Sequence, residues 1–255
     1  MKKAELKNIG VLITRPNNQN QELNSAIKNH GGNSILFPVI NIKPFSYTTI
    51  KSNKEQLKLA SIVIFVSVNA AINGANHFDF TDTKVIAIGP STKDYLEKNN
   101  ITVSYYPKEG YNSEKLLQHA MLSNVKNQII TIIRGEAGRR ILGDELSRRG
   151  GEVQYLETYK REQQRHTKEE ITSLKKNFRD GIIHFIVIMS FETFEYLSII
   201  LNSNHIKLQN SIKFVVPSQR IADKIHACSK NNTCIISPDT QILSIIDAIQ
   251  KNRLV

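Results

Sequence analysis

Short apolar runs alternate with amphipathic segments along the whole chain. Apolar runs occupy residues 11–13, 62–66, 185–189 and 214–216. Between such runs, apolar residues recur at helical spacing, as with Leu23 and Ile27. Strands that are apolar along their full length, each followed by a helix, are typical of parallel sheets covered by helices on both faces. The pattern therefore predicts an α/β protein.

The chain also repeats itself. Residues 11–42 resemble residues 130–161: each segment places an arginine (Arg15 or Arg134) after the first strand and a glycine pair where the helix ends. A second unit, residues 61–107, recurs as residues 184–238. The order along the chain is therefore A, B, A′, B′, and it predicts two domains of flavodoxin-like type.

Two divisions of the chain fit this order. A boundary near residue 125 would give two continuous domains, each close to the usual domain size. In an interleaved arrangement, A would complete B′ and B would complete A′. The repeat by itself leaves both open.

Composition narrows the possible partners. The 255 residues carry 34 Lys+Arg against 23 Asp+Glu, a net charge of +11, which favours a polyanionic partner or simply keeps the chain soluble. Cys228 and Cys234 build no disulfide framework, and no Cys/His spacing indicates zinc. No apolar run approaches the ~20 residues of a membrane span, and no secretory signal is present, so a soluble cytoplasmic protein is expected.

Six predicted strands end in small, polar or basic residues that precede helices. Ligands of parallel sheets bind outside the carboxyl ends of strands, where helix N-termini favour anions. We expect two such edges to form a cleft for a ligand with many carboxylates, because the glycine-rich signatures of nucleotide sites are missing. The six junctions are Arg15-Pro16-Asn17, Ser67-Val68-Asn69, Gly89-Pro90-Ser91-Thr92, Arg134-Gly135-Glu136, Ser190-Phe191-Glu192 and Pro217-Ser218-Gln219.

Two features stand out as candidate chemistry. Arg134 and Arg139, expected at a helix start, could capture a carboxylate, or could instead form a salt bridge to Glu136 or Asp144. Tyr159 lies at the end of A′ beside two cations, which makes it a candidate acid, although a tyrosine at a strand end is more often a packing residue.

A set of short motifs, in a fixed order over essentially the whole chain, resembles the uroporphyrinogen-III synthase family, in particular its bacterial branch. The motifs are Thr14-Arg15-Pro16, Phe37-Pro38-Val39-Ile40, Ser67-x-Asn69-Ala70, Gly89-x-x-Thr92, Asn112-Ser113-Glu114-x-Leu116-Leu117, Arg134-Gly135-x-x-Gly138-Arg139, Gly150-Gly151-x-Val153, Tyr159-x-Arg161 and Ser218-x-Arg220-x-Ala222.

The resemblance implies the interleaved arrangement. Domain 1 would comprise residues 1–40 plus 163–255, and domain 2 residues 43–158. A two-strand ladder near 40–43 and 158–163 would join two flavodoxin-like parallel-sheet domains. A monomer is expected, with hinge motion between the domains.

The resemblance also implies a reaction: hydroxymethylbilane, an octacarboxylate linear tetrapyrrole, is cyclised to uroporphyrinogen III with loss of water and inversion of ring D through a spiro intermediate. It implies no metal, no cofactor, no nucleic acid and no membrane. A transient handover of substrate from hydroxymethylbilane synthase is a further possibility.

By this resemblance Tyr159 is the candidate proton donor to the leaving hydroxyl. Hydroxyls and main-chain amides at the strand ends would bind the substrate carboxylates. The candidate substrate-binding residues are Arg15, Ser67, Asn69, Gly89, Pro90, Ser91, Thr92, Arg134, Gly135, Arg139, Ser190, Phe191 and Ser218.

A non-catalytic two-domain module that binds an anionic metabolite or nucleic acid is the competing hypothesis. The positive charge supports it. However, the lysines are dispersed, and no helix-turn-helix, RNP or zinc pattern occurs. DNA binding with a steep salt dependence, without turnover of hydroxymethylbilane, would favour the module.

Overall fold

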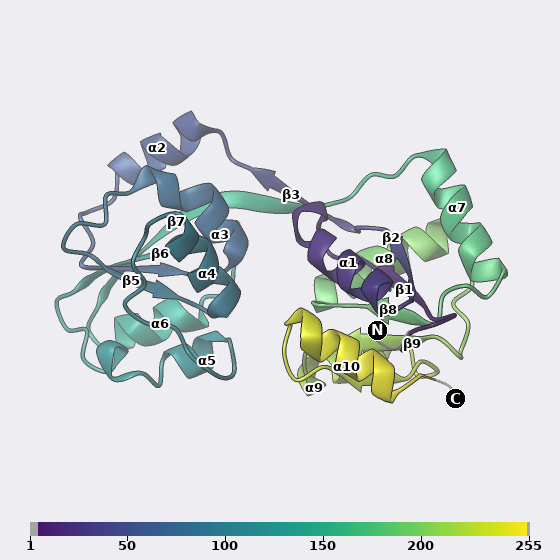
Figure 1. Cartoon of the computed structure of the whole chain (residues 1–255). Helices are drawn as coiled ribbons and strands as arrows, with labels where there is room; N and C mark the ends of the chain where they lie inside the picture. Colours follow the sequence, from purple (N-terminus) through teal and green to yellow (C-terminus); the bar gives the residue numbers. More distant parts are fainter. Residues whose placement is uncertain (1–4, 254–255) are drawn as a thin grey trace. The chain divides into compact units, whose positions relative to one another are not determined.

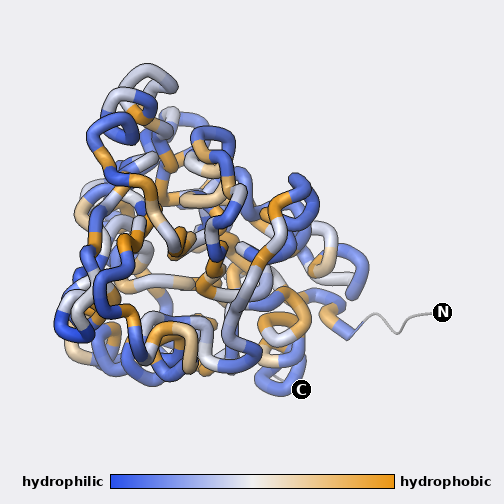
Figure 2. Tube along the Cα trace, turned by 90° about the vertical axis from the view of Figure 1, so that its left-hand side faces the viewer, coloured by the Kyte–Doolittle hydropathy of each residue, from blue (hydrophilic) through white to orange (hydrophobic). Residues whose placement is uncertain are grey.

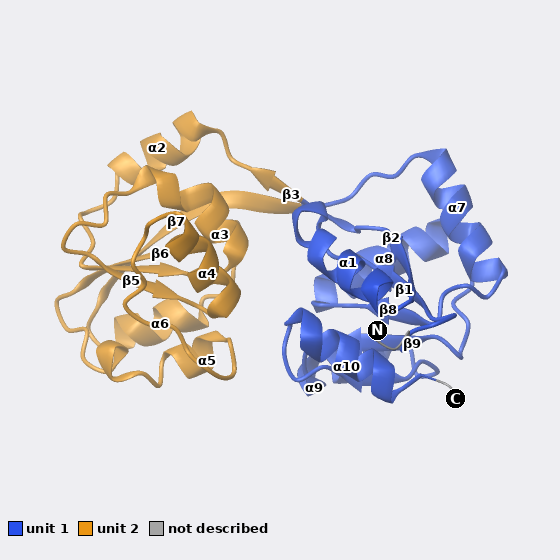
Figure 3. Ribbon diagram, viewed as in Figure 1, with its two compact units in different colours: residues 1–41, 162–255 blue, residues 42–161 orange. Residues whose placement is uncertain are grey.

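The computed structural model describes residues 5–253 as an alternation of strands and helices (Figure 1). Hydrophobic stretches alternate with hydrophilic ones along the chain trace, and hydrophilic residues predominate in the outer loops (Figure 2). The chain divides into two compact units, which are coloured separately in Figure 3. Unit 1 comprises residues up to 41 together with residues from 162 onward, and unit 2 comprises residues 42–161.

Unit 1 contains a five-stranded parallel sheet in the order β10-β9-β8-β1-β2. Renumbered along this unit, the order is the doubly wound 2-1-3-4-5 of flavodoxin-like folds. Its strands are β1 (Gly10–Ile13), β2 (Asn33–Leu36), β8 (Phe185–Val187), β9 (Lys213–Val216) and β10 (Cys234–Ile236). Its helices are α1 (Gln21–Asn29), α7 (Lys168–Arg179), α8 (Phe191–Ser203), α9 (Gln219–Cys228) and α10 (Ile242–Lys251).

Side chains that alternate along these strands build a core on each face of the sheet. On one face, Val11 and Val187 pack with Leu23 and Ile27 of α1 and with Ile245 of α10. On the other face, Phe194 of α8 meets Phe214 of β9 edge-on at a centroid distance of 5.7 Å. Both faces are covered because the central strands β1 and β8 are buried along their whole length.

Unit 2 contains a second five-stranded sheet, in the order β3-β7-β6-β4-β5. Strands β4, β5, β6 and β7 are parallel and repeat the 2-1-3-4 order of unit 1. The strands are β3 (Ile40–Pro44), β4 (Ile62–Phe65), β5 (Lys84–Ala87), β6 (Ile129–Gly135) and β7 (Glu152–Gln163). The helices are α2 (Tyr47–Glu55), α3 (Val68–Gly74), α4 (Pro90–Lys98), α5 (Ser113–Leu116) and α6 (Ile141–Arg148).

The unit 2 core is also divided between two faces. Phe65 and Ile133 pack with Ala70 of α3 and Leu96 of α4 on one face. Ile64 of β4 packs with Leu142 and other residues of α5 and α6 on the opposite face. The two faces again follow from strand alternation.

The topology confirms the predicted fold class and decides between the two divisions of the chain. Strands β1 and β2 share a sheet with β8, β9 and β10, so a boundary near residue 125 is wrong. The A segment pairs with B′, and B pairs with A′. Which segments share a sheet depends on contacts between residues far apart in the sequence, so the repeat alone left the choice open.

Strand β3 fills the edge of the unit 2 sheet beside β7. The amide of Phe45 donates to the carbonyl of Thr158 at 3.0 Å, and that of Gln164 donates to Val39 at 2.9 Å. These two bonds run in antiparallel register, so residues 39–45 and 158–164 form a ladder across the point where the chain passes between the units.

Two kinds of feature are absent from residues 5–253. No helix in this range is long and apolar enough to cross a membrane. No group of three or more His, Cys, Asp or Glu side chains in the same range is placed to hold a metal ion.

Candidate active site

The carboxyl edge of the unit 2 sheet brings together residues from several strands. Between β4 and β6 the strand order reverses, and such a switch point is where open α/β sheets bind ligands. Ser67 follows β4, Gly135 ends β6 and Tyr159 lies on β7. The polar groups predicted from three separate motifs therefore share one end of one sheet.

The side chain of Tyr159 extends from β7 across the neighbouring strand β6. Its side chain is only 1% exposed. A Cβ atom built on Gly135 would lie 2.7 Å from both Cε2 and Cζ of the Tyr159 ring, so glycine at this position leaves the space that the ring occupies. The strand pairing shifts register at this point, between Arg134 and Gly135. The ring thereby reaches over β6 to β4.

The hydroxyl of Tyr159 ends 3.1 Å from the Oγ atom of Ser67. Ser67 is the N-cap of α3, and its Oγ accepts a hydrogen bond from the amide of Ala70 at 2.9 Å. The guanidinium of Arg161 lies 6.0 Å from the Tyr159 ring centroid. A cation, a phenol and a partly exposed hydroxyl thus meet at the switch point.

The neighbouring helix α4 begins as the sequence indicated. Gly89 is its N-cap and Pro90 its first residue, a position where the missing N–H of proline costs nothing. Ser91 is exposed, whereas Thr92 is 2% and Asn69 of α3 is 6% exposed. The start of α4 therefore presents main-chain amides and one exposed hydroxyl to the edge, while the other two polar residues are internal.

Arg134 has structural partners. Its guanidinium forms an ion pair with Glu157 at 2.8 Å, donates to the carbonyl of Gly138 at 3.0 Å and stacks over Tyr155 at 4.0 Å. The alternative predicted from the sequence was a salt bridge from Arg134 to Glu136 or Asp144, and both predicted partners are wrong. Glu157 lies opposite Arg134 in the β6–β7 pairing, a cross-strand contact that local spacing does not reveal.

The predicted helix start after Arg134 is also wrong in position. Helix α6 begins only at Ile141, and the intervening residues form a turn that contains Ala137 at φ 53°. Arg139 lies in this loop and is exposed. The two arginines are therefore not a pair at one helix N-terminus.

Unit 1 has its own switch point, between β1 and β8. Thr14 follows β1 and donates to the carbonyl of Val187 on β8 at 2.5 Å. Arg15 comes next, and its Nη2 donates to the carbonyl of Thr240, just before α10, at 3.2 Å. Its Nε atom is buried without a hydrogen-bond partner. Burial lowers the pKa of Arg15 below its ordinary value, while the charge of Glu22 acts in the opposite direction.

Asn20 is a site candidate that the sequence analysis missed. It is 2% exposed, and neither Oδ1 nor Nδ2 has a hydrogen-bond partner. A buried amide without partners is costly, so it marks a place where a water or a ligand is needed. The signal was available: Asn20 precedes Leu23 and Ile27 at helical spacing, which puts a polar residue on the buried side of α1.

The remaining unit 1 candidates lie at helix starts. Ser190 is the N-cap of α8, and its Oγ accepts from the amide of Thr193 at 3.2 Å. Phe191 stacks near Phe194 and carries the ammonium of Lys224 over its ring at 5.0 Å. Ser218 is the N-cap of α9, but its side chain accepts no capping bond, so its hydroxyl remains available.

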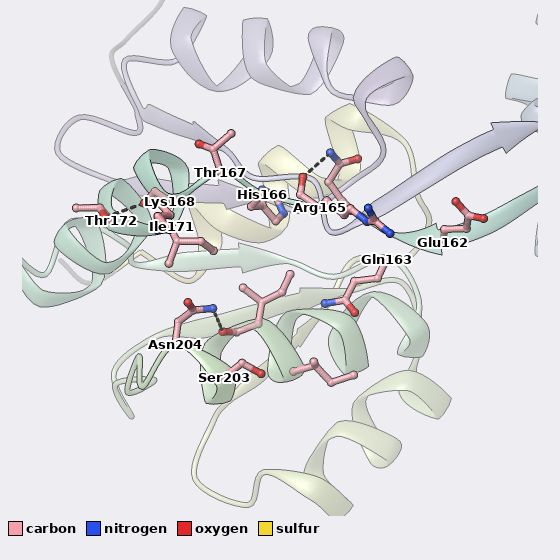
Figure 4. Close-up of a pocket in the computed structure, with 13 residues that line it drawn as sticks. Glu162, Gln163, Arg165, His166, Thr167, Lys168, Ile171, Thr172, Ser203 and Asn204 are labelled. Carbon is pink, nitrogen blue, oxygen red and sulfur yellow. Dashed lines mark hydrogen bonds between the residues drawn. The ribbon is translucent and has the colours of Figure 1, made fainter.

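A pocket with a volume of about 960 Å³ lies elsewhere in unit 1. Figure 4 shows Gln163 at the end of β7 and Thr167 at the start of α7 on one side, and Ser203 and Asn204 at the end of α8 on the other. None of the residues predicted from the sequence lines it. It is therefore separate from the carboxyl edge of the unit 1 sheet.

His166 lines this pocket and supports a prediction about pH. Its ring stacks on Phe37 at 3.9 Å, and its side chain is 5% exposed. Burial lowers the pKa of His166 below 6.5, although Glu170, 3.4 Å from Nδ1, acts in the opposite direction. The neutral ring therefore stabilises the fold above pH 6.5, and this contribution is lost as pH falls through the folded-state pKa.

We expect the free energy of unfolding of the wild type to fall between pH 7.5 and pH 5.5 by more than that of His166→Gln. The difference should be a fraction of the ~1.4 kcal/mol that one pKa unit represents. Urea unfolding of both proteins at the two pH values measures it. An equal fall in both proteins would contradict the assignment.

With this geometry in place, comparison with known proteins decides the family. A family model for uroporphyrinogen-III synthase (HemD) matches residues 21–240. The chain belongs to the uroporphyrinogen-III synthase family. The resemblance predicted from the ordered motifs is thereby confirmed.

Individual relatives agree with this family assignment. The uroporphyrinogen-III synthase of Escherichia coli K12 is 29% identical over 160 residues, which cover 60% of this chain and 65% of that protein. The uroporphyrinogen-III synthase of Proteus mirabilis is 28% identical over 161 residues, or 60% of this chain and 80% of that protein. The match thus spans slightly less than two thirds of the Escherichia coli relative.

Solved structures of the family share the fold. The enzyme from Helicobacter pylori 26695 aligns with a TM-score of 0.64 at 9% identity, covering 96% of this chain and all of that one. A mutant enzyme from the thermophile Thermus thermophilus aligns with a TM-score of 0.59 at 14% identity, with coverage of 96% and 100%. At these identities the similarity supports the architecture of the uroporphyrinogen-III synthase family, not individual side-chain roles.

Proposed function

We propose that this protein is a uroporphyrinogen-III synthase, a lyase that cyclises hydroxymethylbilane to uroporphyrinogen III. The reaction loses water and inverts ring D through a spiro intermediate. The observation that carries the proposal is that both sheets present hydroxyls and helix N-termini at a topological switch point, in a chain that belongs to this family.

The carboxyl edges suit a polycarboxylate. Helix N-termini carry unpaired amides and a partial positive charge, so each can bind a carboxylate without a dedicated lysine or arginine. The starts of α3 and α4 supply such amides in unit 2, and those of α8 and α9 supply them in unit 1. A net charge of +11 attracts the octacarboxylate substrate further.

The chemical step makes modest demands on the protein. The hydroxymethyl group leaves as water once it is protonated, and the pyrrole nitrogen supplies the electrons that expel it. The resulting azafulvene cation is stabilised by its own ring. The Ser67–Tyr159 pair would supply the proton. Holding the linear chain so that ring D meets ring A is an orientation problem, and such problems can be worth up to ~7–11 kcal/mol.

The isomer of the product tests the function. Hydroxymethylbilane, generated in the same vessel by its synthase, is incubated with the purified protein, and the product is oxidised and resolved into isomers I and III. We expect isomer III to predominate. A product that consists of the uninverted isomer I alone would overturn the proposal.

Arg15 is the guanidinium best suited to bind a substrate carboxylate in unit 1. Among residues 5–253 no carboxylate forms an ion pair with it, and its Nε lacks a partner. A partly buried guanidinium without an ion-pair contact is costly, so a ligand carboxylate in that place would be favoured.

We expect Arg15→Gln to raise KM roughly 10-fold or more, since hydrogen bonds to charged groups contribute about 1.5–3 kcal/mol. kcat should change little, because the contact persists from ground state to transition state. Arg179→Gln is the matched control: it removes the same charge from unit 1 just before β8, at an exposed residue paired with Asp180. An equal rise in KM for both variants would attribute the effect to net charge.

We further propose that the protein acts in the cytoplasm as a monomer. Direct handover of the substrate from hydroxymethylbilane synthase would limit spontaneous closure to isomer I. Sedimentation tests the oligomeric state and the handover. The protein alone is expected to sediment as a single species of monomer mass, and a transient complex is expected when the synthase is added.

A further inference from the structure

The oxygen of Ser67 has two hydrogen-bond partners in the protein. One comes from the amide of Ala70 at 2.9 Å. The other partner is the hydroxyl of Tyr159 at 3.1 Å, and the distance by itself fits either direction of donation. Tyr159 is 1% exposed, and its O–H has no other acceptor among residues 5–253. A buried phenol needs an acceptor, so Tyr159 donates to Ser67.

This direction leaves the proton of Ser67 free for a ligand. With two donors on its oxygen, Ser67 has no lone pair left to accept a third bond. Its own O–H is then directed away from both donors, and it donates to no residue within the described part of the chain. Ser67 is partly exposed at the switch point of the unit 2 sheet. Two donors on one hydroxyl oxygen also polarise its O–H bond and make it a better donor.

We propose that Ser67, rather than Tyr159, delivers the proton to the leaving hydroxyl of the substrate, and that Tyr159 is a positioning residue that resupplies it. This inference rests on the proposed function. It follows from burial: a phenol that is almost wholly enclosed presents its hydroxyl to Ser67, and Ser67 presents its own to the edge where the substrate binds.

The proton balance closes over one turnover. The bond between carbon and the leaving oxygen breaks as the Ser67 proton joins that oxygen to form water. The Tyr159 proton moves to the Ser67 oxygen, which leaves a phenolate opposite the azafulvene cation formed in the same step. The guanidinium of Arg161, 6.0 Å from the Tyr159 ring centroid, adds a second positive charge. Ring closure releases one C–H proton, which returns through Ser67 to Tyr159.

A simpler role for Ser67 must be separated from this one. As the N-cap of α3, its oxygen satisfies the amide of Ala70, and its loss would weaken the helix start. A hydroxyl that only caps a helix or binds a carboxylate would affect stability or KM. A hydroxyl that transfers a proton affects kcat, and its effect depends on Tyr159.

The experiment compares Ser67→Ala, Tyr159→Phe, the double variant and Ser67→Thr in the coupled isomer assay, at a temperature where circular dichroism shows every variant folded. We expect Ser67→Ala and Tyr159→Phe each to lower kcat roughly 10-fold or more. The double variant should lose no more than the worse single variant. Ser67→Thr, which keeps both the hydroxyl and the cap, should recover most of the rate. Ser61→Ala, at the other end of β4, is the control and should behave as wild type.

Three results would overturn the relay. An unchanged kcat with a raised KM for Ser67→Ala would make Ser67 a binding residue only. Multiplying losses in the double variant would give the two hydroxyls independent roles. Failure of Ser67→Thr to recover activity while it stays folded would remove the hydroxyl from the mechanism. If the wild type forms no isomer III, the proposed function fails as well, so the two failures are distinguishable.

Discussion

Replacing Gly135 by alanine is expected to lower kcat roughly 10-fold or more, without any change to a polar group. The added Cβ would lie 2.7 Å from two ring atoms of Tyr159 and 3.0 Å from its hydroxyl oxygen. The ring is enclosed, so it cannot move aside without displacing its neighbours or losing its contact with Ser67. Misplacement by about 1 Å can cost on the order of 10²-fold in rate.

The same substitution should also lower the free energy of unfolding by about 1–3 kcal/mol, as overpacking of a closed core does. Gly138→Ala is the matched control in the same turn: its Cβ would lie 3.2 Å from the flexible Arg134 side chain and 3.3 Å from the carbonyl oxygen of Gly135, and no atom of Tyr159 would be closer than 3.8 Å. Steady-state kinetics and urea unfolding of both variants measure the two effects. Wild-type kcat in a folded Gly135→Ala protein would show that the position of Tyr159 does not matter.

Gly10→Ala is expected to destabilise unit 1 while leaving unit 2 folded. A Cβ on Gly10 would lie 1.7 Å from the carbonyl oxygen of Ile182, which is backbone and cannot rotate away. Gly10 is held on both sides, since its amide donates to Nδ1 of His184 at 2.9 Å and its carbonyl accepts from the His184 amide at 2.9 Å. A Gly→Ala substitution can stabilise a protein by about 0.4–1 kcal/mol, because alanine restricts the unfolded chain. This gain is smaller than the cost of overpacking, about 1–3 kcal/mol or more, so the net effect is destabilising.

The distribution of tyrosines makes this prediction specific to one unit. The chain contains no tryptophan, and of its 8 tyrosines only Tyr196 belongs to unit 1. We expect Gly10→Ala to shift the urea transition seen by far-ultraviolet circular dichroism to lower concentration, with little change in the transition seen by tyrosine fluorescence. Ser25→Ala, exposed on α1, should stay within about 0.5 kcal/mol of wild type. Equal shifts in both signals would mean that the units unfold together.

Much of the candidate site could be predicted because its parts are local. Ser67, Gly89, Ser190 and Ser218 are N-caps in the structure, as the change from apolar strand to small polar residue indicated. Arg134 and Arg139 could not be placed in this way, because the turn after β6 delays the helix to Ile141. Asn20 was overlooked because polar residues at helix starts are usually exposed caps.

The amino-acid sequence by itself determined the alternation of parallel strands and helices, the internal repeat and the polar strand ends, since each follows from hydrophobic period and turn chemistry within a short segment. Only the tertiary structure decided which segments share a sheet, because pairing of β1 with β8 joins residues more than a hundred and seventy positions apart. It alone also brought Tyr159 to Ser67 across Gly135, over a separation of 92 residues. Contacts of that kind depend on packing and on the close approach that a glycine permits, and no local pattern encodes them.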